Sequence, residues 1–316
     1  MKNKSKTDKD YFLGGRSMGP WVTAMSAEAS DMSGWLLMGL PGSVYALGTG
    51  QCWIAVGLFL GTVANWLIIS GRLRRYTIVA NNSLTLPAYF ENRFHDKKRI
   101  LLGSSSVIIV IFFLVYTASA FASGGKLFSS VFGCTYHLSL TISAVIILGY
   151  TFMGGFMAVC VTDFVQGMLM LVALVTVPVV AYSLMGGDMM NMLSQTGVSA
   201  DNFMNVMKNG ENNFTAVEII SQLAWGLGYC GMPHILVRFM AVKNQKELNK
   251  SKGIAIVWVI ISLAMAVVIG IVGRAYLYPA VLGADGGSTE TVFIEMITRI
   301  FTQDMYVPIV AGLFLC

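Results

Sequence analysis

The sequence predicts an all-α polytopic membrane protein, and three observations support that fold class. Of the 316 residues, 55% are hydrophobic and only 12% are charged, whereas a soluble domain carries roughly 25% charged residues. The mean hydropathy is +0.68. Apolar stretches of about 20 residues, the length that a helix needs to cross a bilayer, recur along the chain. We therefore expect a multi-pass protein of the cell membrane, surrounded by the lipid bilayer.

Seven of these stretches are long enough to span the bilayer. They are residues 20–47, 50–71, 100–129, 137–158, 161–186, 214–232 and 253–279. An eighth begins near residue 305 and reaches Cys316 before it is long enough to cross, so we expect about seven full spans and a partial eighth. Two further segments are not expected to span. Residues 84–94 are predicted to form a short amphipathic helix at the inner surface, and residues 187–213 a polar external loop with some helical character.

The basic residues predict the orientation of the chain, because cytoplasmic loops carry an excess of Lys and Arg. If the N-terminus is cytoplasmic, the inner segments are 1–19, 72–99, 158–162 and 233–252. These segments hold all of the 21 Lys and Arg except Lys126, Lys208, Arg274 and Arg299. We therefore expect the N-terminus inside. The net charge of +5 then reflects this bias between loops and does not indicate a nucleic-acid partner.

The first span contains an unusual polar stretch, AEASDMSGW, at residues 27–35. Asp31 lies near mid-membrane, where a charge costs about 2.5–3.5 kcal/mol, and Glu28 lies one helical turn before it. The neighbouring residues are small or form helices weakly, and Pro41 follows. We expect the helix to unwind between Ala29 and Gly34, so that main-chain carbonyls line an ion and substrate site. The alternative is a kinked helix whose serines hydrogen-bond a neighbour.

The sixth span has a second predicted break, in AWGLGYCGMPH at residues 224–234. Three glycines and Pro233 crowd into eight residues beside Trp225 and Tyr229, which would share one helix face. The alternative is a glycine-rich packing surface with interfacial aromatic residues. Two broken helices separated by four spans fit an inverted five-helix repeat, in which such breaks indicate a binding site at the midplane.

This repeat divides the chain into four predicted parts. They are a cytoplasmic N-terminal segment (1–19), a first five-helix repeat (20–186), the external loop (187–213) and an incomplete second repeat (214–316). Two single residues leave alternatives open: Tyr116 is either packed or functional in the third span, and Asp163 either caps a helix or serves the site. No nucleotide loop, nucleophile elbow or zinc motif occurs, so we do not expect an enzyme.

Four stretches of the sequence resemble the sodium/solute symporter family, and most closely its bacterial members that carry proline. They are DYFLGGRSMGPWVTAMSAEASDMSGWLLMGLPG (10–42), LTLPAYFENRF (84–94), YTFMGGFMAVCVTDFVQ (150–166) and WGLGYCGMPHILVRFMA (225–241). The resemblance implies an inverted-repeat fold of five plus five helices that couples transport to Na⁺, here incomplete. It also implies Na⁺ as the co-transported ion and L-proline as the solute.

The resemblance further implies roles for individual residues. The Na⁺ site or its coupling is assigned to Ala29 and Met32, through their carbonyls, and to Asp31. The proline site is assigned to Ser33, Gly34, Trp35, Tyr116, Trp225 and Tyr229. Coupling or the ion pathway is assigned to Arg16 and Asp163, and Glu28 is expected to tune the site.

Two alternatives to proline uptake remain open on the sequence. One is Na⁺-coupled transport of another small solute, such as an osmolyte, a sugar or pantothenate, and the other is a transporter-like membrane sensor. Because the family carries one more helix before DYFLGGRS and completes its Na⁺ site beyond PIVAGLFLC, we expect a truncated symporter that does not transport by itself.

Overall fold

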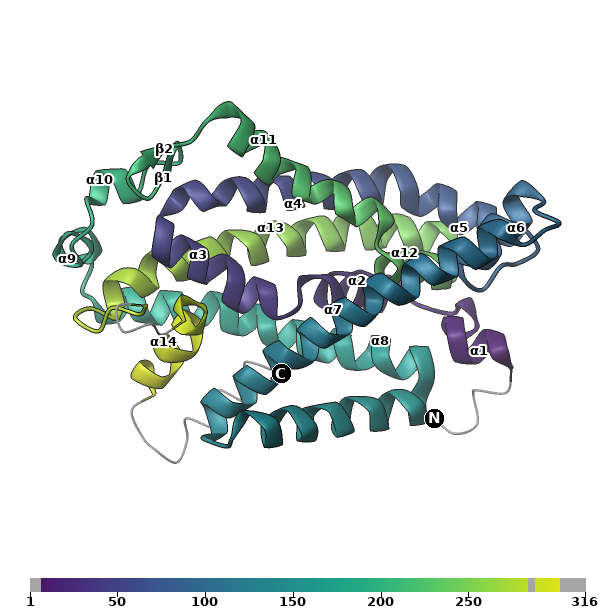
Figure 1. Ribbon diagram of the computed structural model, residues 1–316, viewed down its shortest axis with the longest axis horizontal. Coiled ribbons are helices and arrows are strands. Elements are labelled where there is room, and N and C mark those ends of the chain that lie inside the picture. Colours follow the sequence, from purple (N-terminus) through teal and green to yellow (C-terminus); the bar gives the residue numbers. More distant parts are fainter. Residues whose placement is uncertain (1–6, 284–287, 302–316) are drawn as a thin grey trace.

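A computed structural model describes residues 7–283 and 288–301. Figure 1 shows long helices running alongside one another, with shorter helices and connecting loops at both ends. The first half contains α1 (Asp8–Leu13), η1 (Gly14–Arg16), α2 (Pro20–Gly34), η2 (Trp35–Gly39), α3 (Leu40–Leu47), η3 (Thr49–Gln51), α4 (Cys52–Ala64), η4 (Asn65–Ile69), α5 (Ser70–Val79), α6 (Leu86–Phe94), α7 (Ile100–Phe132) and α8 (Tyr136–Leu184).

The second half begins with the loop predicted at 187–213, which carries two short helices and a two-stranded antiparallel hairpin. Its elements are α9 (Met189–Gln195), α10 (Ala200–Phe203), β1 (Lys208–Asn209) and β2 (Asn212–Asn213). Then follow α11 (Ala216–Ala224), η5 (Trp225–Gly231), α12 (Pro233–Ala241), α13 (Gln245–Tyr276), η6 (Thr289–Thr291) and α14 (Val292–Ile300). The sequence did not predict the hairpin or α14.

Among the described residues, four helices are long and apolar enough to cross a membrane. They are Thr49–Val79, Ile100–Ser130, Tyr136–Leu184 and Gln245–Tyr276. The long α8 reverses at Gly155, where φ is +60°, a conformation that glycine adopts without steric cost. Its two legs are therefore the spans predicted at 137–158 and 161–186. The predicted spans 20–47 and 214–232 are interrupted helices, and the segment expected from residue 305 lies outside the described residues.

The predicted unwinding between Ala29 and Gly34 is wrong. Helix α2 continues through Gly34, and the Ser30 hydroxyl donates to the Ser26 carbonyl at 2.8 Å, a local bond that is compatible with helix. The irregularity lies one step later, in the π-helical segment η2. Pro41 explains its position, because proline has no amide to donate to the carbonyl of the residue four positions earlier, which lies inside η2.

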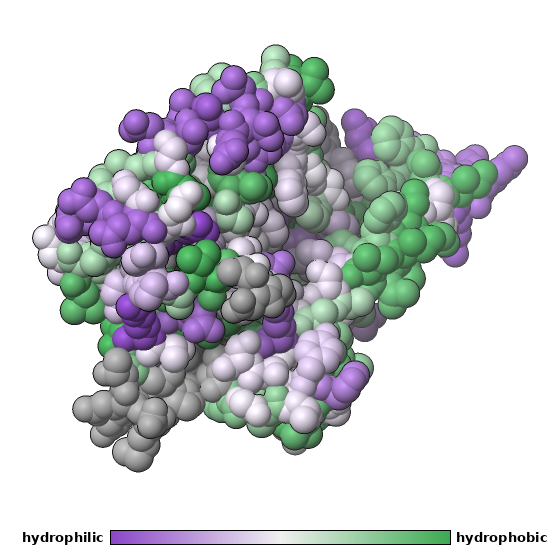
Figure 2. All heavy atoms as spheres, turned by 60° about the vertical axis from the view of Figure 1, so that its left-hand side comes forward, coloured by the Kyte–Doolittle hydropathy of each residue, from purple (hydrophilic) through white to green (hydrophobic). Residues whose placement is uncertain are grey.

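Helix α13 lies at the centre of the bundle. It packs against α2, α3, α4 and α8, and the side chains of Val259, Ala266 and Ile269 on it are fully buried. Helix α7 differs, because Phe112 and Leu114 on it are 69% and 72% exposed. Figure 2 shows hydrophobic side chains exposed in several patches of the surface, beside hydrophilic areas. Exposed apolar areas of this kind indicate contact with lipid.

Candidate functional site

A cavity of ≈150 Å³ lies between the end of α2, the π-helical segment η2 and the middle of α7. It is lined by Gly34, Trp35, Met38, Gly39, Tyr116, Ser119, Ala120, Ser123 and Glu290. Three of the predicted substrate residues, Gly34, Trp35 and Tyr116, are therefore brought together. The volume is below the ~300–1,000 Å³ of pockets for drug-sized ligands, so the cavity suits a small solute.

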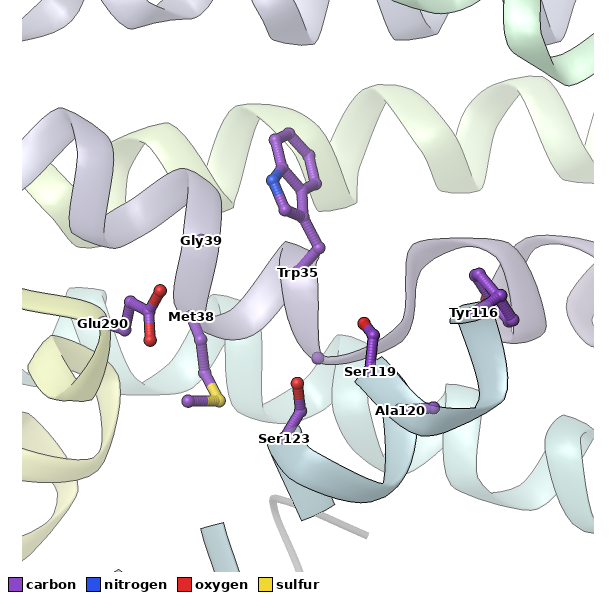
Figure 3. A pocket seen from close by; sticks show the side chains of 9 residues that line it. Trp35, Met38, Gly39, Tyr116, Ser119, Ala120, Ser123 and Glu290 are labelled. Atoms are coloured by element: carbon purple, nitrogen blue, oxygen red, sulfur yellow. The ribbon is translucent and has the colours of Figure 1, made fainter. Parts of the chain in front are cut away.

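The polar groups of this cavity come from elements far apart in the sequence. Figure 3 shows Tyr116 and Glu290 at opposite ends, with Trp35 on one side and the hydroxyls of Ser119 and Ser123 on the other. Glu290 belongs to η6, near the end of the described chain. The Glu290 carboxylate is paired with Lys126 of α7 at 2.6 Å. What the cavity offers to a small zwitterionic solute is therefore the two serine hydroxyls and the aromatic side chains.

The predicted break in the sixth span is confirmed. Helix α11 ends at Ala224, a 3₁₀ segment follows, and Met232 is extended with φ −72° and ψ 107° before α12 begins. Trp225 on this segment packs its ring against Trp35 with 5.3 Å between the ring centres. Tyr229 is 6% exposed. The two interrupted helices therefore meet, although neither Trp225 nor Tyr229 lines the ≈150 Å³ cavity.

Asp31 faces the protein interior and not the lipid. Its side chain is 3% exposed, and Oδ1 lies 3.8 Å from Nε2 of His234 on α12. The other carboxylate oxygen of Asp31 and both ring nitrogens of His234 have no hydrogen-bond partner in the described part of the chain. A buried polar atom without a partner is costly. Asp31 thus offers a buried carboxylate oxygen that could coordinate a cation or accept a hydrogen bond from a polar ligand.

Tyr116 connects three helices at this position. Its hydroxyl donates to the main-chain carbonyl of Ser30 at 3.1 Å. Its ring stacks on the imidazole of His234, with 5.3 Å between centres and an angle of 23°. Tyr116 also lines the cavity, and a role for it in substrate binding stays a prediction.

Glu28 is buried, with 3% exposure. One of its carboxylate oxygens accepts a hydrogen bond of 2.7 Å from the indole nitrogen of Trp66, which lies on η4. The Trp66 ring in turn packs edge-on against Phe239 of α12, with 4.5 Å between centres. Glu28 therefore connects α2 to the second span, a role beside the tuning predicted for it.

The two residues predicted to bind Na⁺ through their carbonyls lie within α2, Met32 in its last turn. The carbonyl of Met32 accepts the amide of Trp35, and the Ala29 methyl faces Gly167 on α8. Binding of Na⁺ by these carbonyls stays a prediction, as does the role of Ser33, whose side chain is outside the described part of the structure. No group of three or more His, Cys, Asp or Glu able to hold a metal occurs in residues 7–283 and 288–301.

Asp163 does not cap a helix, because it lies inside the second leg of α8 and forms an ion pair. Its Oδ2 lies 2.7 Å from Nη2 of Arg238 on α12, and the two side chains are 14% and 6% exposed. The Ser26 hydroxyl donates to the same oxygen at 2.7 Å and accepts from Arg238 Nε at 2.6 Å. Sequence reasoning missed Ser26 and Arg238. The usable signal is the position of Arg238, which follows the sixth-span break. On the sequence alone, this arginine is assigned only to the cytoplasmic segment 233–252.

Arg16 lies at the opposite end of α2 from the cavity and is 7% exposed. Its guanidinium donates to the carbonyls of Met240 at 2.6 Å and Ser83 at 2.9 Å. Burial, with the nearby charge of Arg74, lowers the pKa of Arg16 to about 10, so it remains charged at neutral pH. Arg16 therefore connects the start of α2 to α12 and to the loop before α6.

Comparisons with known proteins show what the chain is similar to. The family profile described as "Sodium:solute symporter family" matches residues 11–316. The chain is 45% identical over 315 residues to the sodium/proline symporter of Escherichia coli (strain K12), covering 98% of this chain and 60% of that protein. It is 45% identical over 306 residues to sodium/proline symporter 2 of Staphylococcus saprophyticus, covering 97% and 57%. The chain thus spans about 60% of the length of the curated relatives it matches.

A solved structure shares the fold. It is described as the substrate-bound outward-open state of a Na⁺-coupled sialic acid symporter, and it matches with a TM-score of 0.77 at 18% identity. The match covers 99% of this chain and 64% of that one. The all-α transporter architecture predicted from the sequence is therefore confirmed.

Proposed function

The chain belongs to the sodium:solute symporter family, and on that premise we propose that it serves the uptake of L-proline together with Na⁺ across the cell membrane. The function is transport and not catalysis. Inward movement of Na⁺ drives the uptake, because each charge that crosses is worth about 2.3 kcal/mol per 100 mV. The N-terminus lies on the cytoplasmic side, in accordance with the basic segments. Residues 20–186 form the first repeat, and residues from 214 onward belong to the second.

The observation that most supports this proposal is the position of Asp31 beside the cavity. Its unpartnered carboxylate oxygen lies one helical turn before Gly34, which lines the cavity together with Trp35 and Tyr116. A cation held by Asp31 would therefore lie next to a bound solute, and each would favour the binding of the other. Such reciprocal coupling between two ligands is what symport requires.

The cavity also suits the chemistry of proline. Proline carries a carboxylate, a secondary ammonium and an apolar ring. The hydroxyls of Ser119 and Ser123 can donate to the carboxylate. The faces of Trp35 and Tyr116 can pack the ring and attract the ammonium.

The proposal is tested by uptake of labelled proline into proteoliposomes, with the protein expressed from its complete reading frame. An inward Na⁺ gradient is expected to drive accumulation, and an equal K⁺ gradient is not. In Asp31→Asn the Na⁺ concentration for half-maximal uptake is expected to rise about 10- to 150-fold, since a hydrogen bond or contact to a charged group is worth about 1.5–3 kcal/mol. The matched control Asp201→Asn makes the same change at an exposed position of α10 and is expected to keep the wild-type value.

Substrate identity is tested in the same vesicles. Unlabelled proline is expected to compete fully, and an osmolyte, a sugar or pantothenate is expected to compete weakly. Uptake by the wild type that is indifferent to Na⁺ would refute the coupling. Full competition by one of the other solutes, with weak competition by proline, would show that this solute and not proline is the substrate.

A further inference from the structure

A second cavity, of ≈370 Å³, opens on the surface between α5 and α6. It is distant in the sequence from the residues of the first cavity, and its wall combines two arginines with tyrosines and aliphatic side chains. Arg72 comes from α5 and Arg93 from α6. Cys230 of η5 and Leu236 of α12 also line the groove, but none of the residues assigned above to the Na⁺ or proline site does.

Neither arginine has an acidic partner among the described residues. Arg72 forms no hydrogen bond or ion pair with any residue that the structure describes. Arg93 lies over the ring of Tyr76, with 5.1 Å from its guanidinium carbon to the ring centre, and makes no ion pair there. The nearest acidic residue on α6, Glu91, is already paired with Arg99 at 3.0 Å. The groove therefore presents two guanidinium groups whose charge is not compensated within the described chain.

The remainder of the groove is apolar. Ile68 is 54% exposed and Phe90 36% exposed at its rim, and Leu86 is buried beneath them. Ile68 lies within Thr49–Val79, one of the four candidate membrane spans. Arg72 follows it by one helical turn. Because Arg72 follows Ile68 toward the end of that span, we expect the charged part of the groove near the lipid headgroups and Ile68 nearer the acyl chains.

We propose that this groove binds one anionic phospholipid, with its phosphate between Arg72 and Arg93 and an acyl chain along Ile68 and Phe90. Arginine forks match phosphate geometry, and basic pockets beside the cytoplasmic ends of membrane helices bind anionic headgroups. A free anion would leave the apolar half of the groove without a partner. The choice of the inner leaflet follows the orientation proposed above, whereas binding itself does not depend on it.

The test uses the detergent-purified protein and palmitoyl-oleoyl phosphatidylglycerol, with phosphatidylcholine of the same chains as the neutral comparison. Native mass spectrometry measures how many lipids the protein retains as each is titrated. The wild type is expected to retain one phosphatidylglycerol in preference to phosphatidylcholine. In Arg72→Gln/Arg93→Gln the affinity for phosphatidylglycerol is expected to fall about 30-fold, at about fivefold per charge, with phosphatidylcholine unchanged.

A matched control removes the same charge from the same surface. Arg75→Gln/Lys97→Gln changes two basic residues that do not line the groove, and it is expected to lower the affinity by less than about threefold at physiological salt, where screening acts over about 8 Å. Equal losses in both double variants would show diffuse attraction and overturn the site. Full displacement of the lipid by soluble glycerol phosphate, or a wild type that retains no lipid because another protein segment fills the groove, would also overturn it. All the substituted side chains are exposed, so folding is expected to survive the changes.

Discussion

Replacing Asp163 by Asn is expected to destabilise the protein strongly, because it leaves the guanidinium of Arg238 buried without its counter-charge. The change keeps the size of the side chain. It also keeps an oxygen that can accept from the Ser26 hydroxyl, which bonds the carboxylate at 2.7 Å. What is lost is the ion pair with Arg238, whose side chain is 6% exposed.

The magnitude follows from the geometry. Two unit charges 2.7 Å apart attract by about 6 kcal/mol at an effective dielectric constant of about 20. Desolvation of both groups cancels part of that attraction, and removal of one partner from a buried pair typically costs about 3–5 kcal/mol. Arg238 keeps its bonds to Ser26 and to the His234 carbonyl, so we expect about 3 kcal/mol.

The assay is thermal unfolding in detergent, followed by a thiol-reactive dye. Its signal rises above the initial reaction of the partly exposed cysteines when Cys160, which is fully buried in the fold, becomes accessible. For domains of about 150–250 residues a loss of 1 kcal/mol lowers the Tm by roughly 2–4 °C, so a fall of at least about 6 °C is expected. Asp201→Asn is again the matched control, and surface changes of this kind stay within about 0.5 kcal/mol.

A double-mutant cycle separates the ion pair from other effects. Arg238→Met alone leaves Asp163 buried without its partner, and the two changes together leave neither charge. The double variant is therefore expected to be more stable than the sum of the single losses predicts, by about 1–3 kcal/mol. Strict additivity, or an Asp163→Asn protein as stable as the wild type, would refute the reasoning.

Three further predictions concern other contacts. Trp66→Phe removes the hydrogen-bond donor to buried Glu28 and is expected to lower the stability by about 1.5–3 kcal/mol in thermal unfolding. Adding Glu28→Leu is expected to recover part of that loss, and a double variant with no recovery would contradict the prediction. In Gly57→Ala the new methyl lies 2.6 Å from a carbonyl oxygen of α11, and this clash is expected to cost about 1–3 kcal/mol of stability. The control Gly103→Ala, whose methyl meets nothing within 4 Å, is expected to be neutral or stabilising. Equal Tm values for the two variants would count against close packing at Gly57. The hydrogen bond from the lysine of α7 holds the pKa of Glu290 below its usual 4.5, so this half-exposed pair is expected to add about 0.2–1 kcal/mol above pH 4.5 and to lose it as the pH falls through the lowered pKa. The Tm difference between wild type and Glu290→Gln should therefore close in acid, and a difference that widens there would contradict the sign.

The interrupted helices show how far local sequence reasoning reaches. The break at residues 224–234 was predicted because three glycines and Pro233 weaken helix wherever they stand, and it is confirmed. The break predicted at Ala29–Gly34 rested on the same argument from small residues and is wrong. Small polar side chains such as Ser30 bonded their own helix, and the missing amide of Pro41 moved the distortion forward to η2.

The sequence alone determined that this protein is a helical membrane protein of a recognisable symporter family, and its predicted spans at 50–71, 100–129, 137–158, 161–186 and 253–279 overlap the four apolar helices of the described structure. These properties depend on composition, hydrophobic length and glycine or proline content, which each segment carries by itself. Only the tertiary structure decided which side chains meet. Asp163 pairs with Arg238, which is 75 residues away in the sequence. Glu290 and Gly34 line the same cavity, and Arg72 and Arg93 line one groove. Such pairings depend on how whole helices pack against one another, and no local pattern in the chain encodes that packing geometry.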